Sequence, residues 1–223
     1  MASIVEICNT ALAHLGDDAT VASIDPPEGS PQAEHCKRFY PMAVRNTLER
    51  HAWAFATKRA ILAELTLPTN INQWQYVYAL PADFITAIAV LDYTAPDDFN
   101  SLPNPPFMNY LSVPIPPYTP QPYNIESFAN GTKVLYTNQQ YALLRYVSDV
   151  NDTSKFSGLF TDAATRLLAS YLAGPVIKGT EGRQVAQTLL KEYEAVLALA
   201  KDQDGEQTDI DIRHTPDWIG SRN

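Results

Sequence analysis

The chain has 223 residues, of which 45% are hydrophobic and 18% are charged, and its formal net charge at pH 7 is −9. This composition supports a packed core and excludes a wholly disordered chain. An acidic chain is repelled by nucleic acid unless its few basic residues are clustered, so general nucleic-acid binding is disfavoured.

The termini and cysteines indicate the setting of the protein. Residues 1–16 lack the basic start of a secretory signal, and Glu6 interrupts their apolar part. We therefore expect neither a signal peptide nor a membrane span. The only two cysteines, Cys8 and Cys36, fall at apolar positions of predicted helices. This pattern predicts two buried free thiols in a soluble protein of a reducing compartment.

Two helices are predicted near the N-terminus. Residues 2–15 carry apolar side chains at helical spacing, with Ser3 as a candidate N-cap and Glu6 three residues later, which is the spacing of a capping box. A second helix is predicted from Pro31 to the region of Trp53. Pro41 lies inside it and removes a backbone donor, so we expect a kink or a restart there.

The pattern changes from helix to strand after Phe55. Trp74, Tyr76, Tyr78 and Leu80 alternate with other residues, which predicts one half-buried strand. Further strands are expected at 84–91, 123–128, 133–137 and 141–147, with an Asn-Gly hairpin turn at 130–131. Residues 60–132 also contain six acidic side chains and no Lys or Arg.

A proline-rich arm is predicted within the β-rich part. Residues 96–122 hold nine of the seventeen prolines, so they form neither a helix nor a central strand. The segment is too rich in large apolar side chains for a solvated linker, and we expect it to lie on a neighbouring subunit or a tail component. The candidate contact residues are Phe107, Tyr110, Leu111, Ile115 and Tyr118.

Two helices are predicted towards the C-terminus, at 156–176 and 181–201, and their long apolar faces favour antiparallel packing. Residues 204–223 are predicted to form an extended tail that is ordered only against a partner. Its candidate contact residues are Ile210, Ile212, His214, Trp218 and Ile219.

The expected fold class is therefore α+β. Residues 1–60 and 151–203 are predicted to form a helical bundle, with residues 61–150 as a β-rich insertion that includes the arm. Trp53 and Phe55 lie where the chain passes from one part to the other, and we expect them to form the core of the junction.

No catalytic set is recognisable. The four histidines are scattered, and none has the spacing of a metal site or a nucleophile motif. Asp209, Asp211, His214 and Asp217 could hold a divalent ion, but their spacing matches no known loop. We predict no catalytic residue, no metal and no cofactor, and we interpret these four residues as part of a solvated acidic tail.

The basic residues around the second helix admit two interpretations. Arg45, Arg50, Lys58 and Arg59 could form a nucleic-acid patch, or they could make ion pairs and subunit contacts. The second interpretation is favoured because the chain is acidic and no aromatic stacking groove accompanies these residues.

Four blocks of sequence carry a resemblance. These blocks are ICNTALAHLG at 7–16, AEHCKRFYPMAVRNTLERHAWAFATKR at 33–59, WQYVYALPADF at 74–84 and FTDAATRLLA at 160–169. The chain resembles the head-to-tail adaptor proteins of tailed phages, including the tail tubular protein A family of short-tailed phages. The proline-rich segment is not covered. The most specific part runs from Arg45 to Arg59.

The resemblance implies a ring, dodecameric in that family, which binds the portal protein and joins it to the tail tube or nozzle protein. DNA would pass through the ring without specific binding, and the protein would be assembled in the host cytoplasm and end in the virion. An acidic lumen would suit such a conduit, because it repels phosphate. We therefore expect part of the acidic 60–132 block, or acids near the junction, to face the channel.

Two rival hypotheses belong to other classes. The chain could be a binding module that acts as a scaffold or chaperone in tail assembly, in which case it would be absent from purified particles. An enzyme would require a convergent acid–base pair in a pocket, and the sequence offers none.

Overall fold

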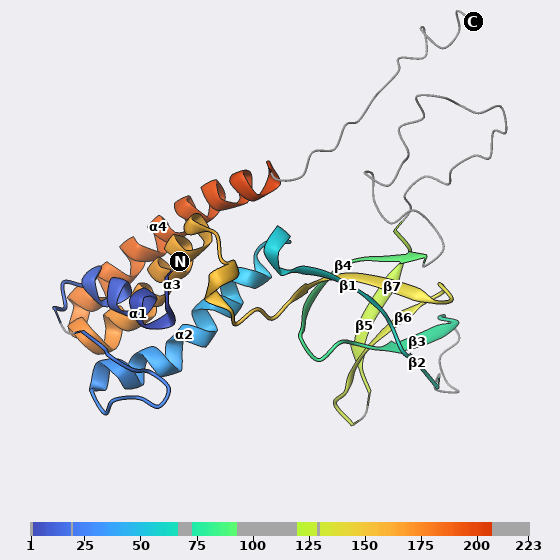
Figure 1. Cartoon of the computed structure of the whole chain (residues 1–223), viewed down its shortest axis with the longest axis horizontal. Coiled ribbons are helices and arrows are strands. Elements are labelled where there is room, and N and C mark those ends of the chain that lie inside the picture. Colours follow the sequence, from blue (N-terminus) through green and yellow to red (C-terminus); the bar gives the residue numbers. More distant parts are fainter. Residues whose placement is uncertain (1, 19, 67–72, 93–119, 129, 207–223) are drawn as a thin grey trace, which may run out of the picture. The chain divides into compact units, whose positions relative to one another are not determined.

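The computed structural model describes all residues except 1, 19, 67–72, 93–119, 129 and 207–223. The described residues form four α-helices and two antiparallel sheets, so the predicted α+β class is confirmed. The chain divides into two compact units, and Figure 1 labels the helices and strands. The helical unit consists of the described residues within 1–60, 81–88 and 145–205, and the β unit of the described residues within 61–80, 89–144 and 206–223.

Helix α1 spans Ile4–Ala13, inside the predicted range 2–15. The predicted capping box is present: the Glu6 N–H donates to the Ser3 hydroxyl at 3.1 Å, and the Ser3 N–H donates to the Glu6 carboxylate at 3.2 Å. These bonds satisfy N–H groups that have no partner within the helix, and they fix where the helix begins.

Helix α2 spans Pro31–Glu49 as a single element with Pro41 inside it, so the predicted restart does not occur. One missing N–H costs a single hydrogen bond, whereas burial of the apolar stripe of α2 stabilises the helix on both sides of the proline. The helix also ends earlier than predicted. The Arg50 N–H turns back to the Thr47 carbonyl at 3.3 Å, and the chain then leads into the short 3₁₀ helix η1 at Ala54–Ala56.

Helices α3 (Gly158–Ile177) and α4 (Gly179–Gly205) are separated by Lys178 alone. Helix α3 agrees with the predicted range 156–176 to within two residues and contains Pro175, and α4 ends beyond the predicted limits of 201 for the helix and 203 for the bundle. Lys178 has a φ of 62°, which is strained for a residue with a Cβ. Helix α3 packs against α4, α2 and α1.

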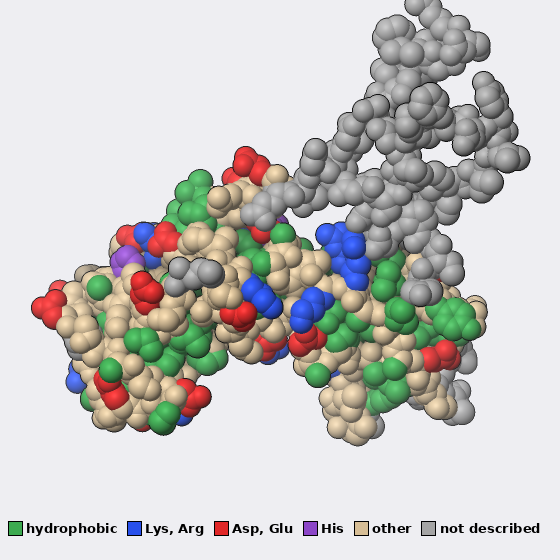
Figure 2. All heavy atoms as spheres, in the orientation of Figure 1, with side chains coloured by type: hydrophobic (Ala, Val, Ile, Leu, Met, Phe, Trp, Pro, Cys, Tyr) green, Lys and Arg blue, Asp and Glu red, His purple; other side chains and the backbone are tan. Residues whose placement is uncertain are grey.

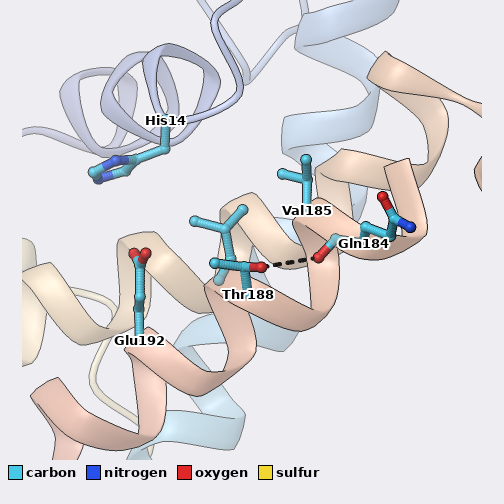
Figure 3. A pocket seen from close by; sticks show the side chains of 6 residues that line it. His14, Gln184, Val185, Thr188 and Glu192 are labelled. Carbon is cyan, nitrogen blue, oxygen red and sulfur yellow. Dashed lines mark hydrogen bonds between the residues drawn. The ribbon is translucent and has the colours of Figure 1, made fainter. Parts of the chain in front are cut away.

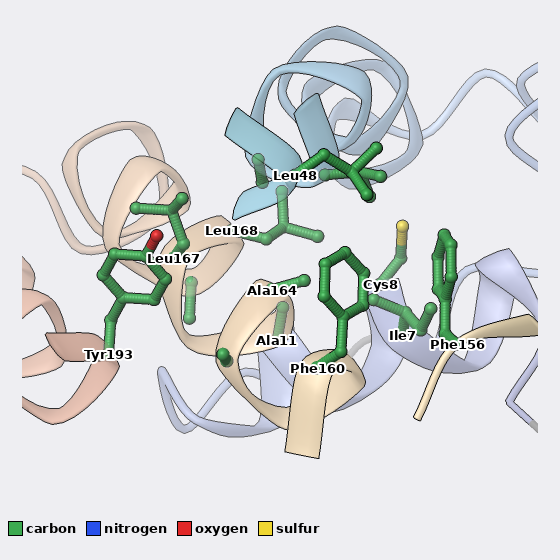
Figure 4. Close-up of a cluster of buried hydrophobic side chains, with 14 of the residues drawn as sticks. Ile7, Cys8, Ala11, Leu48, Phe156, Phe160, Ala164, Leu167, Leu168 and Tyr193 are labelled. Atoms are coloured by element: carbon green, nitrogen blue, oxygen red, sulfur yellow. The ribbon is translucent and has the colours of Figure 1, made fainter. Parts of the chain in front are cut away.

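The helical core is built on α3. Figure 4 shows Phe160 and Leu168 of α3 among Cys8 of α1, Leu48 of α2 and Tyr193 of α4, and all five side chains are buried. Apolar residues at spacing three and four thus place one helix against three others.

The strands form two sheets (Figure 1). The three-stranded sheet has the order β1-β7-β4, and the four-stranded sheet has the order β2-β3-β6-β5. The strand bounds are Thr57–Ile61 for β1, Glu64–Leu65 for β2, Tyr76–Ala79 for β3, Phe84–Asp92 for β4, Tyr123–Ser127 for β5, Lys133–Thr137 for β6 and Ala142–Ser148 for β7. Another 3₁₀ helix, η3, spans Thr153–Lys155.

The predicted hairpin turn is confirmed. Strands β5 and β6 pair antiparallel, with Ile125 opposite Leu135. Between them Gly131 has a φ of 81°, and its N–H donates to the Phe128 carbonyl at 2.8 Å. A left-handed φ favours glycine, so the Asn130-Gly131 signal predicted this turn correctly.

Strand β3 is shorter and more buried than predicted. It spans Tyr76–Ala79 rather than 74–80, and the adjacent residues Val77 and Tyr78 are 0% and 1% exposed. The predicted half-buried alternation is therefore wrong. Val77 packs in one apolar cluster with Val134 and Tyr136, while the Tyr78 hydroxyl donates to the Gln139 carbonyl at 3.0 Å.

Candidate functional site

Trp53 is the largest fully buried side chain among the described residues, with 0% exposure. Its ring lies edge-on to Phe160 of α3 at a centroid distance of 5.0 Å, and it is 6.1 Å from Phe55. Its indole N–H donates to the Thr47 carbonyl at 3.0 Å. The donor is therefore satisfied, and Trp53 closes the end of α2.

Phe55 extends the same aromatic cluster. Its ring lies 5.0 Å from Phe160 and 5.6 Å from Phe156, and the latter two rings are 4.7 Å apart. Both predicted junction residues thus pack against aromatic side chains of the helical unit. Their predicted role between the bundle and the β-rich part stays a prediction.

A polar cluster is centred on Asp83, just before β4. Lys58 Nζ donates to Asp83 Oδ2 at 2.6 Å, and the Tyr146 hydroxyl donates to Oδ1 at 2.8 Å. The backbone carbonyl of Asp83 accepts from the Asp149 N–H at 2.7 Å. Asp83 thereby joins three segments of the helical unit that are distant in sequence.

The pKa shifts in this cluster indicate a structural role. The hydrogen bond from Lys58 lowers the pKa of Asp83, and the hydrogen bond from Tyr146 acts in the same direction. Burial, followed by the bond to Asp83, raises the pKa of Tyr146 to about 12. A general acid or base works best with a pKa near the operating pH. At neutral pH, Asp83 is charged and Tyr146 is protonated, and neither is suited to proton transfer.

Arg45, Arg50 and Lys58 form ion pairs, as the favoured interpretation predicts. Arg45 lies 3.4 Å from Glu49 and 3.7 Å from Asp149. Arg50 lies 2.8 Å from Glu194 of α4, and Lys58 pairs with Asp83. On the face shown in Figure 2, acidic and basic side chains are interspersed over the helices. These pairs are partly exposed, so each contributes little to stability.

A second buried carboxylate lies at the end of α4. Asp204 is 7% exposed, and its two oxygens accept from the Ala54 N–H at 3.2 and 3.0 Å. Its Oδ2 also lies 3.2 Å from His51 Nε2. The His51 ring in turn meets Trp53 edge-on at 5.0 Å. The end of α4 is thus tied to the turn that follows α2.

Open hollows on the described part of the helical unit include two that are lined by side chains of its helices. One, of about 330 Å³, lies beside α1 and α4 and is lined by His14, Thr188 and Glu192 among others, with the His14 ring on the side of Glu192 (Figure 3). Glu192 is 3.5 Å from Arg166 and is therefore already partnered. The other, of about 400 Å³, is lined by residues of α2, α3 and α4: Asn46, Glu49, Arg50, Leu167, Tyr171, Leu190 and Tyr193. Neither hollow brings together a nucleophile, a base and an orienting group.

The predicted buried thiols are confirmed, since Cys8 and Cys36 are both free and buried. A hydrogen bond with Cys36, together with burial, raises the pKa of Cys8, so this thiol stays protonated at neutral pH.

The described histidines have separate surroundings. His14 lines the first hollow, His35 stacks on Phe39 at 6.4 Å, and His51 faces Asp204. Within the described part of the chain, no group of three or more His, Cys, Asp or Glu residues could hold a metal ion. None of the described helices is both long and apolar enough to cross a membrane.

The remaining predicted site residues lie outside the described residues. They are the arm residues Phe107, Tyr110, Leu111, Ile115 and Tyr118, the tail residues Ile210, Ile212, His214, Trp218 and Ile219, and the acidic group Asp209, Asp211 and Asp217.

The sequence interpretation missed both buried or half-buried carboxylate clusters. Asp83 was one acid in a block without basic residues, and Asp204 was assigned to the tail. A local signal exists only for Asp83, which follows the Leu80-Pro81 pair directly before a strand. Asp204 contacts a residue 150 positions earlier, and local pattern contains no such information.

Comparison with known proteins adds no relative: no protein-family model matches the chain, and no curated protein matches it.

Proposed function

We propose that this chain is a structural protein of a tailed-phage particle. It acts as a head-to-tail adaptor, which forms a ring on the portal and links it to the tail tube or nozzle. The proposal is based on the resemblance of the sequence blocks at 33–59, 74–84 and 160–169, and on the contacts between those blocks.

The observation that carries the proposal is that side chains from these three sequence blocks contact one another in the folded chain. Lys58 of the first block pairs with Asp83 of the second at 2.6 Å. Trp53 of the first block packs on Phe160 of the third at 5.0 Å. Residues that carry the resemblance thus make mutual contacts within one unit. This supports a likeness of fold rather than a chance likeness of short, unrelated segments.

The chemistry of the described residues is compatible with this role. An adaptor needs surfaces that bind neighbours and does not need a reactive group. The Asp83 carboxylate and the Tyr146 phenol hold segments of the chain together. The pKa of Asp83 is lowered and that of Tyr146 is raised, so neither group titrates near neutral pH. The candidate surfaces are the tail, whose proposed partner is the portal protein, and the arm, whose proposed partner is a neighbouring subunit or a tail component.

We also propose that acidic side chains face the lumen of the ring, although fewer residues qualify than the sequence suggests. Asp83 is neutralised by Lys58 and is no longer a free charge for a channel. Glu64 on β2 and Glu126 on β5 are exposed and remain candidates. An assembled ring with these carboxylates on its outer rim would contradict this part.

The test of the proposal is deletion of residues 207–223. The deletion begins after Asp204 and Gly205, so the contacts of the α4 end are kept. We expect the shortened chain to fold with an unchanged unfolding transition and to lose attachment to the purified portal protein. Unchanged attachment would exclude the tail as the portal-binding segment.

Electron microscopy of the particle tests the ring itself. We expect symmetric density for this chain directly under the portal. If the chain is instead required for tail assembly but absent from purified particles, it is an assembly scaffold or chaperone and not an adaptor.

A further inference from the structure

The carboxylate of Asp204 is placed where a helix normally disfavours it. The C-terminal end of a helix carries partial negative charge, so a carboxylate in the last turn is destabilising unless another group compensates it. Helix α4 has no basic residue in its last turn, and Asp204 lies one residue before its end at Gly205. Because the side chain is also buried, its partners must lie in other elements.

Those partners are two groups in the turn after α2. The Ala54 N–H is the first of the 3₁₀ helix η1, and Trp53, in the N-cap position, provides no side-chain acceptor. Asp204 provides this acceptor from α4, with both oxygens within 3.2 Å of the Ala54 nitrogen. The imidazole of His51, at 3.2 Å, is the second partner. One carboxylate thus caps η1 and holds the last turn of α4.

The contact of Asp204 lies at the start of the predicted portal-binding tail. The sequence predicts a tail from 204 to 223, whereas Asp204 and Gly205 belong to α4. The first candidate portal-contact residue, Ile210, follows Asp204 by six positions. A segment that starts from a fixed helix end loses less conformational freedom on binding than one that starts from a frayed end.

We propose that Asp204 is a positioning residue for the C-terminal segment. By fixing the last turn of α4 to Ala54 and His51, it holds in place the helix end that precedes the segment. This inference rests on the proposed function, in which the segment binds the portal.

The experiment uses the full-length chain and the purified portal protein, with three variants. Asp204→Ala removes the acceptor. Asp204→Asn keeps one acceptor oxygen for Ala54 and is the conservative rescue. Asp202→Ala is the matched control, because it removes an exposed carboxylate from the same helix turn. The measurements are amide hydrogen exchange and portal affinity.

We expect Asp204→Ala to raise exchange at Ala54 and in the last turn of α4 by about tenfold or more, the scale of a lost hydrogen bond to a charged group. Portal affinity should fall severalfold. Asp204→Asn should recover part of both losses, and Asp202→Ala should match the parent.

The outcomes separate the two proposals. Equal portal affinity for the parent and Asp204→Ala, with raised exchange, would overturn the positioning role and leave Asp204 as a structural cap. Unchanged exchange would overturn the contact itself. A parent chain that does not bind the portal would overturn the proposed function, whatever the exchange data show.

Discussion

At the scale of single residues, Trp53 makes the clearest contribution to stability. Its side chain is fully buried, meets three aromatic rings and has its N–H satisfied. We expect Trp53→Ala to lower the free energy of unfolding by about 3–5 kcal/mol, the range for deletion of a large buried aromatic. Denaturant unfolding measures this.

Met42 on α2 provides the control for this variant. It is large, apolar and 51% exposed, so Met42→Ala should change stability by less than about 0.5 kcal/mol. If the two variants unfold alike, Trp53 does not anchor the core.

The Asp83 carboxylate should make the free energy of unfolding depend on pH in the acidic range. Its pKa is lowered in the folded state from the ordinary value of 3.8, so its contribution is present above that value and is lost as pH falls through the lower folded pKa. The Asp83→Asn variant should therefore be less stable than the parent at neutral pH, by about 1 kcal/mol or less for a partly exposed pair. The difference should shrink below pH 3.8. A pH-independent difference would show that the titration of Asp83 is not involved.

The Tyr146 phenol should make the free energy of unfolding depend on pH in the alkaline range. Its pKa is raised from 10.0 to about 12, so its contribution is complete below pH 10.0 and is lost as pH rises towards 12. The parent should lose stability in this window more steeply than Tyr146→Phe, which has no proton to lose. Thermal unfolding at a series of pH values measures the two slopes, and parallel slopes would contradict the assignment.

Residue-scale features were predictable only where they are local. The Ser3–Glu6 capping box and the Gly131 turn involve neighbours within four positions, and both are present. The Asp83–Lys58 and Asp204–Ala54 contacts join residues that are 25 and 150 positions apart. Sequence pattern describes a residue's own neighbours along the chain, and it does not specify which distant donor a carboxylate will meet.

At the scale of elements, the α3–α4 pair depends on one close approach. A Cβ added at Gly182 of α4 would lie 2.8 Å from the Ala173 backbone carbonyl oxygen of α3. Because backbone cannot move aside as a side chain can, Gly182→Ala should destabilise the protein by about 1–3 kcal/mol. Chemical denaturation measures this difference.

Gly158 is the matched control for Gly182, because it is also helical and has open space around its Cβ position. Gly158→Ala should leave stability unchanged or raise it by up to about 1 kcal/mol. Equal effects of the two substitutions would argue against a tight α3–α4 contact.

The existence and type of the elements followed largely from periodicity, whereas their limits did not. Helix α2 continues through Pro41 and α4 continues to Gly205, because tertiary contacts compensate local signals that favour an end. Strand β3 lost its predicted alternation because both of its faces are covered. In each case burial outweighs a local preference, which is worth about 3 kcal/mol for a proline inside a helix and about 1 kcal/mol or less for most other residues.

At the scale of the whole molecule, the arm gives a prediction about assembly. Replacing Phe107, Tyr110 and Ile115 by Ser should leave the folded chain intact but impair tail completion, because the apolar contacts of the arm with its proposed partner are lost. Counting complete tails by electron microscopy measures this. Normal tails would indicate that the arm is an ordinary surface loop.

The one-residue link at Lys178 also bears on the order of folding. A link this short costs little entropy to close, so α3 and α4 can pair as soon as both exist. Helices α1 and α2 pack on α3, which is made more than a hundred residues later. At about 5–20 residues per second, the ribosome would leave the apolar faces of α1 and α2 uncovered for several seconds or more. The N-terminal helices are therefore the part of the nascent chain most exposed to aggregation, and a chaperone that acts on this chain should bind there.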